Sequence, residues 1–400
     1  MMKLLRYFLL VVFPLFFVAC ADDPDPDEDF PGPVDRTVLA YIAGNNNLSS
    51  FLSANIDDMC LGMKGVGGNL IVYFASTDGN PKLYKITSDG SKTLLKTYEG
   101  QNAMDPAVMR EVVNEVFESY PANSYGLVLS SHADGWTPVS DATKTRMMLE
   151  QRHPQAMITK WFGQDWSGKG ASAYMNITDM AAALPVGRQL DFMLFDACFM
   201  ASVEALYDLR NNTKQIIASP TEVMGNGFPY QQIVPLLFAT HVDAQKVAQT
   251  YVDSYRGTTY PSASVAVINT SELEALATTV KDLMAVHPDY SSLDLSAIQA
   301  FELKQCHLYY DLDDYLAQLS GKDLYYQTFQ EQLSKTVAYV DYTPTIYSAY
   351  GEPAGDFFTV NHCCGLSSFI PQSDPLYTAA YWNTNWAKVI SSQASNNDEK

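Results

Sequence analysis

The sequence predicts an α/β fold: a mostly parallel sheet with helices on both faces, plus a helical C-terminal extension. Through the first half of the chain, short apolar runs typical of buried strands alternate with segments whose apolar residues recur at helical spacing. The chain has 400 residues, of which 47% are hydrophobic and 18% charged, so it can bury a large core. This composition excludes a disordered or collagen-like chain.

The regular elements are expected in order from residue 37. Helices are expected from Asn47, from Asp105-Pro106 and from near Phe199, because apolar residues follow each of these points at helical spacing. Buried strands are expected at 37–43, 70–75, 126–131, 190–195, 214–219 and 264–269. This order is typical of βαβ units, in which ligands and chemistry lie beyond the carboxyl ends of the strands.

The remaining segments are less regular. Two strand-like runs within 82–98 flank a turn of Ser, Asp and Gly residues, which indicates a hairpin. The stretch 137–178 has no clean period and carries several Lys and Arg residues, so we expect a long exposed loop. From 271 to 342 the chain is expected to be mainly helical, with later strands near 345–350 and 365–371.

The N-terminus resembles a bacterial lipoprotein signal. Residues 1–19 have a short basic region and an apolar run too short to span a bilayer comfortably. The run ends in Phe17-Val18-Ala19-Cys20, which resembles a lipobox and would make Cys20 the lipidated first residue; a simple secretory signal is the alternative. Residues 20–35 form an acidic, proline-rich tether, and 36–400 are expected to be one domain with a helix-rich second half. We therefore expect a protein anchored to the outer membrane by lipid, either surface-exposed or periplasmic.

The charge and the cysteines limit the possible partners. There are 25 Lys and Arg against 45 Asp and Glu, so the net charge of −20 argues against nucleic-acid binding and favours a positively charged partner or substrate. Besides Cys20 the chain has five cysteines, an odd number, so one thiol at least stays unpaired within a monomer. That thiol is either an inert buried group or a reactive nucleophile.

Two expected strands end in residues that carry chemistry. His132 follows the run that ends at Ser131, and Cys198 follows the run that ends at Phe195. If a helix begins near Phe199, its positive N-terminal end favours the thiolate of Cys198. A histidine supplies the acid or base that a cysteine nucleophile needs to expel an amine.

The residues around this pair resemble the clostripain family of cysteine peptidases, which belongs to the caspase and gingipain clan. The resemblance covers roughly residues 36–371 and implies a caspase-like fold. The segments that carry it are Tyr41–Leu48, Ser130–Trp136, Asp196–Met200 with Glu204, Ala218–Glu222, Gly227–Tyr230, Tyr310–Leu316 and Gly365–Pro371. It implies an endopeptidase that cleaves after Arg or Lys.

The resemblance also implies roles for individual residues. Cys198 would attack the scissile carbonyl, His132 would protonate the leaving amine, and the amide of Ala133 would bind the oxyanion together with that of Cys198. Asp196 would hold a basic substrate side chain, although it could also cap a helix. Asn226 stands where a second acidic pocket residue is expected.

Two departures from the family pattern put the specificity in question. Ala133 replaces the usual glycine and could crowd the oxyanion, while Asn226 and the neighbouring Pro220 make the region less acidic than the pattern. Family members are often activated by internal cleavage after a basic residue, and Arg146 in the 137–178 loop is the candidate here.

Other functions remain open on the sequence. The chain could be a catalytically inactive relative that binds peptide or protein, or a metal hydrolase that uses His132 and Asp134. No cofactor is expected to be required. Zinc at His362-Cys363-Cys364 lacks a second ligand pair, and calcium near Asp311–Asp314 lacks an EF-hand pattern. The expected partners are a peptide or protein substrate and the outer membrane, and no nucleic acid.

Overall fold

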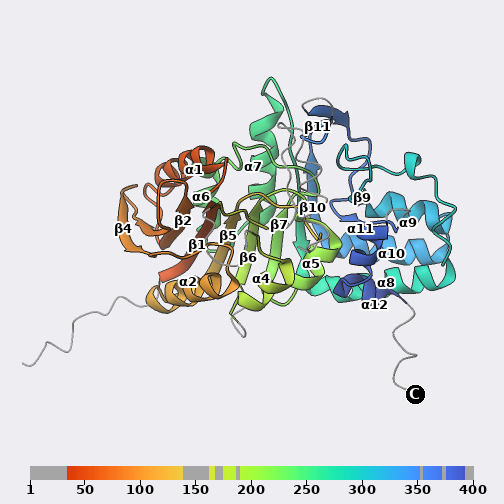
Figure 1. Ribbon diagram of the computed structural model, residues 1–400, viewed down its shortest axis with the longest axis horizontal. Helices are drawn as coiled ribbons and strands as arrows, with labels where there is room; N and C mark the ends of the chain where they lie inside the picture. Colours follow the sequence, from red (N-terminus) through yellow and green to blue (C-terminus); the bar gives the residue numbers. More distant parts are fainter. Residues whose placement is uncertain are drawn as a thin grey trace, which may run out of the picture. The chain divides into compact units, whose positions relative to one another are not determined.

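The computed structural model describes residues 34–137, 162–166, 174–185, 190–351, 355–371 and 375–391. From Val34 onward the chain forms one compact unit. Its centre is a nine-stranded sheet in the order β10-β8-β7-β6-β5-β1-β2-β3-β4 (Figure 1). These strands are β1 (Val34–Gly44), β2 (Asn69–Ser76), β3 (Lys82–Ile86), β4 (Lys92–Thr97), β5 (Ala122–Ser130), β6 (Leu190–Asp196), β7 (Thr213–Ala218), β8 (Ser264–Asn269) and β10 (Val337–Tyr342).

The middle of the sheet is parallel and its two flanks are antiparallel. Strand β1 pairs in parallel with β2 and β5, and β6 pairs in parallel with β5 and β7. The hairpin β3–β4 and the strands β8 and β10 extend the sheet with antiparallel pairs. The described residues also contain the short strands β9 (Tyr310–Asp311), β11 (Thr345–Ser348), β12 (Asp356–Thr359) and β13 (Ser367–Ser368).

Helices cover both faces of the sheet, because alternate residues of its strands point in opposite directions. Val38, Ala40 and Ile42 of β1 pack in one core with α1, α6 and α7, whereas Leu39 and Tyr41 pack in the other with α2, α4, α5 and α8. In Figure 1 the first group lies above the sheet and α2, α4 and α5 lie below it. The helices are α1 (Ser49–Gly62), α2 (Pro106–Ser119), α4 (Ile177–Ala183), α5 (Val203–Leu209), α6 (Tyr230–Leu237), α7 (Ala244–Arg256), α8 (Leu273–Val286), α9 (Leu312–Ser320), α10 (Leu324–Thr336), α11 (Pro375–Tyr381) and α12 (Asn385–Ile390). Two 3₁₀ turns, Thr270–Glu272 and Leu295–Ala297, complete the regular structure of the described residues.

The predicted α/β sheet, parallel in its middle and covered by helices, and the 82–98 hairpin are confirmed. Two expectations are wrong in detail. The helix expected from near Phe199 begins only at Val203, after a tight turn. The segment 271–342, expected to be mainly helical, is interrupted by irregular chain after α8 and ends in strand β10. No helix among the described residues has the length and apolar character needed to cross a membrane.

A buried carboxyl group joins the first half of the fold to the second. Glu204 of α5 is 1% exposed and accepts hydrogen bonds from the Ser368 hydroxyl and the Phe369 amide, both at 2.9 Å. Its other oxygen, Oε2, is buried with no hydrogen-bond partner. Burial therefore raises the pKa of Glu204 to about 7.

This shift predicts a specific dependence of stability on pH. A carboxyl group whose pKa is raised by folding stabilises the fold fully below its unfolded pKa, and that contribution is lost as the pH rises through the folded pKa. A shift from 4.5 to about 7 corresponds to roughly 3 kcal/mol lost between about pH 4.5 and pH 7. In urea titrations, the free energy of unfolding of the wild type should fall by roughly 3 kcal/mol more than that of Glu204→Gln between about pH 4.5 and pH 7. Glu331→Gln, at an exposed position of α10, is the control, and equal slopes for wild type and Glu204→Gln would contradict the assignment.

Candidate active site

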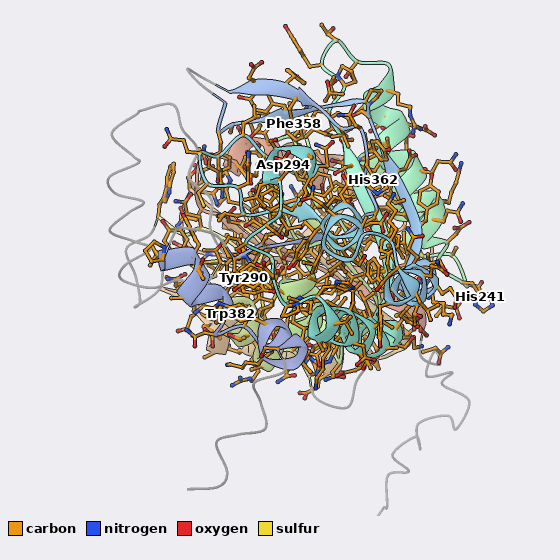
Figure 2. The ribbon with its side chains drawn as sticks, turned by 90° about the vertical axis from the view of Figure 1, so that its right-hand side faces the viewer. His241, Tyr290, Asp294, Phe358, His362 and Trp382 are labelled. Carbon is orange, nitrogen blue, oxygen red and sulfur yellow. The ribbon has the colours of Figure 1, made fainter. Side chains whose placement is uncertain are left out.

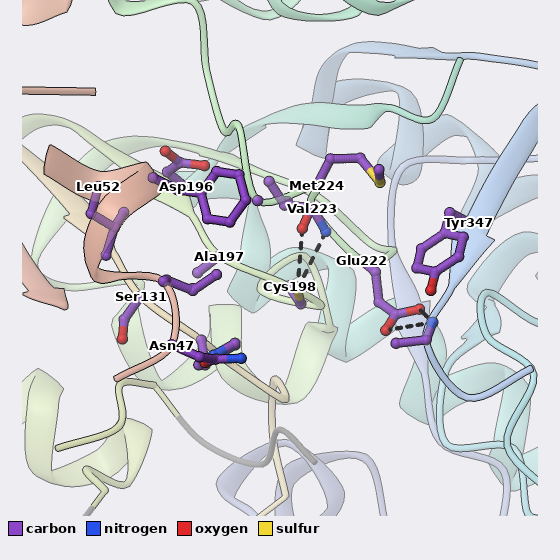
Figure 3. A pocket seen from close by; sticks show the side chains of 15 residues that line it. Asn47, Leu52, Ser131, Asp196, Ala197, Cys198, Glu222, Val223, Met224 and Tyr347 are labelled. Carbon is purple, nitrogen blue, oxygen red and sulfur yellow. Dashed lines mark hydrogen bonds between the residues drawn. The ribbon is translucent and has the colours of Figure 1, made fainter. Parts of the chain in front are cut away.

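Strands β5 and β6 bring the predicted histidine and cysteine to the same edge of the sheet. The two strands are parallel neighbours in which Ser130 pairs with Asp196, so His132 and Cys198 emerge side by side from their carboxyl ends. Both side chains line one cavity of about 200 Å³ (Figure 3). Its lining residues are Asn47, Leu48, Phe51, Leu52, Ser131, His132, Asp196, Ala197, Cys198, Glu222, Val223, Met224, Gly225, Tyr347 and Ala349.

Cys198 lies in a strained turn, and this corrects the expectation of a helix N-terminus. Phe199 has a φ of 59°, a left-handed conformation that costs a non-glycine residue free energy. The Phe199 amide donates to the Thr221 carbonyl at 2.9 Å, and its ring stacks on Tyr309 with centroids 4.2 Å apart. These contacts hold the turn, and the helix begins five residues after Cys198.

The surroundings of the Cys198 sulfur favour the neutral thiol. Burial raises its pKa above the usual value, and Glu222 adds to this effect whenever its carboxyl group is ionised. The Val223 amide donates a hydrogen bond to Sγ at 3.3 Å, which lowers the pKa only in part. The thiolate that a helix N-terminus would have favoured is therefore not expected in the resting site.

His132 is buried and also neutral. It is 6% exposed, and burial lowers its pKa to about 4. Its Nε2 lies 2.6 Å from Oδ1 of Asn47, in the loop between β1 and α1. Around neutral pH, the site thus contains an uncharged thiol and an uncharged imidazole.

Ala133 does not crowd the cavity. It is fully buried, belongs to the hydrophobic core on the α2 side of the sheet, and forms an isolated antiparallel bridge with Phe162. It is not among the residues that line the cavity. Its methyl group thus packs in the core and not in the cavity, and the oxyanion role of its amide and the crowding of the oxyanion both stay predictions.

Asp196 is the acidic residue of the cavity that the sequence predicted. It is 6% exposed and accepts a hydrogen bond from the Tyr230 hydroxyl at 2.9 Å. Burial raises its pKa to about 6. The alternative role as a helix cap is wrong, because Ser202 occupies the position before α5.

Asn226 was expected to complete the acidic pocket, and the structure places it elsewhere. It is exposed and does not line the cavity. The second lining carboxylate is Glu222, which accepts from the Ala349 amide at 2.9 Å and whose pKa burial raises to about 8. In the view of Figure 3, Asp196 and Glu222 lie on opposite sides of Cys198. Glu222 is the last residue of the segment Ala218–Glu222, which carried the resemblance. Its position in the sequence did not indicate that it lines the cavity.

The metal-hydrolase arrangement of His132 and Asp134 does not form. Asp134 is fully buried, absent from the cavity lining, and paired with Lys304 through Nζ–Oδ1 and Nζ–Oδ2 distances of 2.9 and 3.1 Å. The Tyr309 hydroxyl also donates to Asp134 Oδ1 at 2.9 Å. Through these contacts Asp134 fixes the loop that carries His132 to Lys304 and Tyr309.

His362, which was considered for zinc and is labelled in Figure 2, lies close to the aspartates that were considered for calcium. Ligand atoms of Asp311, Asp314 and His362 lie within 4.8 Å of one another. His362 Nε2 is also 3.2 Å from Asp313 Oδ2, and this contact raises the pKa of His362 to about 9. A protonated imidazole cannot bind a metal, so at neutral pH the cluster is an ion-pair network unless a cation displaces the proton. The thiols of Cys363 and Cys364 are free.

Two predicted residues, Cys20 and Arg146, lie outside the described part of the chain.

A thiol and an imidazole share one pocket at the carboxyl edge of the parallel part of the sheet, which is compatible with nucleophilic catalysis by a cysteine. The model of the clostripain family, Peptidase C11, matches residues 40–399. The chain belongs to the clostripain family.

Individual relatives agree with this membership. Clostripain from Hathewaya histolytica is 24% identical over 230 residues, which span 49% of this chain and only 41% of that protein. A secreted C11 cysteine protease from Bacteroides thetaiotaomicron, solved with an irreversible peptide inhibitor, is 32% identical with a TM-score of 0.77, covering 89% of this chain and 99% of that one. An inactive zymogen C11 protease from Parabacteroides distasonis has the same identity and TM-score, covering 90% and 99%. The predicted caspase-like fold and the class of cysteine endopeptidase are thereby confirmed.

Proposed function

We propose that this chain is an endopeptidase in which Cys198 is the nucleophile and His132 the general acid and base. The observation that carries the proposal is the shared cavity: the two side chains emerge from adjacent parallel strands and line it together. An inactive peptide-binding relative would not need a thiol and an imidazole there. The inactive alternative is therefore not favoured.

The reaction follows from the protonation states of the resting site. As the Cys198 sulfur attacks the scissile carbonyl, its proton passes to the imidazole of His132, because neither group is ionised beforehand. The carbonyl oxygen becomes an oxyanion, for which the amides of Ala133 and Cys198 are the proposed donors. The imidazolium then protonates the departing amine, and water hydrolyses the resulting thioester with His132 as base.

The proposed specificity is for Arg or Lys before the cleaved bond. Asp196 and Glu222 both line the cavity, and among its lining residues there is no Lys or Arg to neutralise them. Burial raises their pKa values to about 6 and about 8, and the positive charge of Lys304 offsets this only in part at Glu222. A bound guanidinium or ammonium group would therefore favour both carboxylates. A basic substrate side chain would supply that cation.

This specificity predicts the effect of Asp196→Asn on two peptides that differ only in Arg or Gln before the bond. Loss of a charge-assisted hydrogen bond should lower kcat/KM for the Arg peptide by about 10- to 100-fold and leave the Gln peptide nearly unchanged. Asn226→Ala is the matched control, because Asn226 is exposed and outside the cavity. An equal loss on both peptides, or a loss of Arg preference in Asn226→Ala, would contradict the assigned pocket.

The proposal also covers the membrane anchor and the activation of the protein. Lipidation at Cys20 would anchor the chain to the outer membrane, and cleavage at Arg146 within 137–178 would activate it. The related Parabacteroides structure of an inactive zymogen supports a precursor that requires activation.

A further inference from the structure

His132 has a hydrogen-bond partner whose chemistry determines which ring nitrogen carries the proton. Oδ1 of Asn47 lies 2.6 Å from Nε2 of His132. An amide oxygen only accepts hydrogen bonds, so Nε2 is the donor in this pair. In the neutral imidazole the lone pair is then on Nδ1, which becomes the nitrogen that can accept or return a proton.

The loop that carries Asn47 is held firmly beside the histidine loop. Asn46, 1% exposed, donates from Nδ2 to the carbonyls of Ala43 and Gln164 at 3.1 and 2.9 Å and accepts from the Leu48 amide at 2.9 Å. Ser131, adjacent to His132, donates to the same Ala43 carbonyl at 2.6 Å. The two loops therefore share an anchor at the end of β1.

The segment 162–166 adds a second link between these loops. The Gly163 amide donates to the His132 carbonyl at 2.7 Å, and the Trp166 amide donates to the Asn45 carbonyl at 2.9 Å. Asp165 accepts from the Asn45 side chain at 2.8 Å. These hydrogen bonds fix the backbone next to Asn47 and the backbone of the histidine loop. The short contact between Asn47 and His132 is therefore held in place by both loops.

We propose that Asn47 is the positioning residue of this site: it fixes the orientation and tautomer of His132 so that Nδ1 serves Cys198 and the leaving amine. The inference rests on the proposed roles of Cys198 and His132. An amide suits this task at a buried imidazole because it orients the ring without adding a charge. The imidazole consequently stays a weak base until the thiol proton arrives.

The test compares Asn47→Ala and Asn47→Asp by the pH dependence of kcat/KM on an Arg peptide. Asn47→Ala should lower kcat by about 10- to 100-fold, the size typical of lost second-layer support, and leave KM within about twofold. Asn47→Asp keeps an oxygen acceptor, so it should recover most of kcat. Its carboxylate should also raise the pKa of His132 and shift the acid limb of the profile to higher pH. Ser50→Ala, at an exposed position nearby on α1, is the control.

Different outcomes separate this inference from the proposed function. If Asn47→Ala retains the kcat of the wild type, or if Asn47→Asp behaves like Asn47→Ala with an unmoved acid limb, the positioning role is wrong. Cys198→Ala and His132→Ala assayed in parallel report on the proposed function alone. Thermal unfolding of each variant identifies a loss that comes from the fold instead of the site.

Discussion

Replacing Cys198 with alanine is expected to lower hydrolysis of Arg and Lys peptides by about 10⁴-fold or more, because no nucleophile remains to form the acyl-enzyme. His132→Ala should cause a loss of similar size, since the thiol is neutral at rest and needs a base to receive its proton. The double variant should be little worse than either single variant, because the two groups act in one step. Progress curves with fluorogenic peptides measure all three.

Matched controls distinguish these losses from general damage. Cys60→Ala removes a free thiol of α1 outside the cavity, and His241→Ala removes an exposed imidazole. Both should retain the activity of the wild type. Hydrolysis that survives Cys198→Ala and His132→Ala would contradict the pair. Mass spectrometry of the wild type and Cys198→Ala also tests self-processing, since a segment 137–178 that is intact in both would exclude cleavage by the chain itself.

Lys304→Met is expected to cause a large loss of stability. Lys304 is 10% exposed and its partner Asp134 is fully buried, so the variant leaves a carboxylate without its cation in the interior. Breaking a buried pair from one side typically costs about 3–5 kcal/mol. Activity should fall as well, because Asp134 supports the histidine loop and the positive charge of Lys304 lowers the pKa of Glu222. Urea unfolding measures the first effect and peptide hydrolysis the second.

Two further variants distinguish loss of the Lys304–Asp134 ion pair from the general effect of replacing a lysine side chain. Asp134→Asn combined with Lys304→Met removes both charges and should recover part of the lost stability. Lys281→Met, at an exposed position of α8, should change stability by less than about 0.5 kcal/mol. A Lys304→Met protein as stable as Lys281→Met would show that the pair contributes little.

The elements that position the site could be predicted because they are local and strongly patterned. The strands predicted at 126–131 and 190–195 are built on apolar runs, and His132 and Cys198 follow them at the carboxyl edge of the sheet. The convergence of His132 and Cys198 follows from this topology. The start of α5 could not be predicted correctly because Phe199 adopts a positive φ in the preceding turn. Such a turn is usually indicated in a sequence by a glycine, and none is present here.

The other residues of the site could not be predicted because their contacts are distant in sequence. Asn47 meets His132 across 85 positions, and Lys304 meets Asp134 across 170. Neither pair carries a periodic or spacing signal. Glu222 and Asn226 are both polar residues after the same strand, and only the path of the chain decides that Glu222 lines the cavity. Likewise, the sequence groups His362 with its neighbours Cys363 and Cys364 as possible zinc ligands. In the structure His362 instead contacts Asp313 of α9.

The central claim is that the cavity at Cys198 binds a basic side chain and reacts through that sulfur. A peptide that ends in a chloromethyl ketone after Arg, incubated with the full chain, tests both parts in one experiment. Intact and tandem mass spectrometry should find one adduct, on Cys198, that forms faster than with the Gln analogue and is absent from Cys198→Ala. An adduct on Cys60, Cys306, Cys363 or Cys364 in its place, or equal rates for the Arg and Gln reagents, would contradict the account.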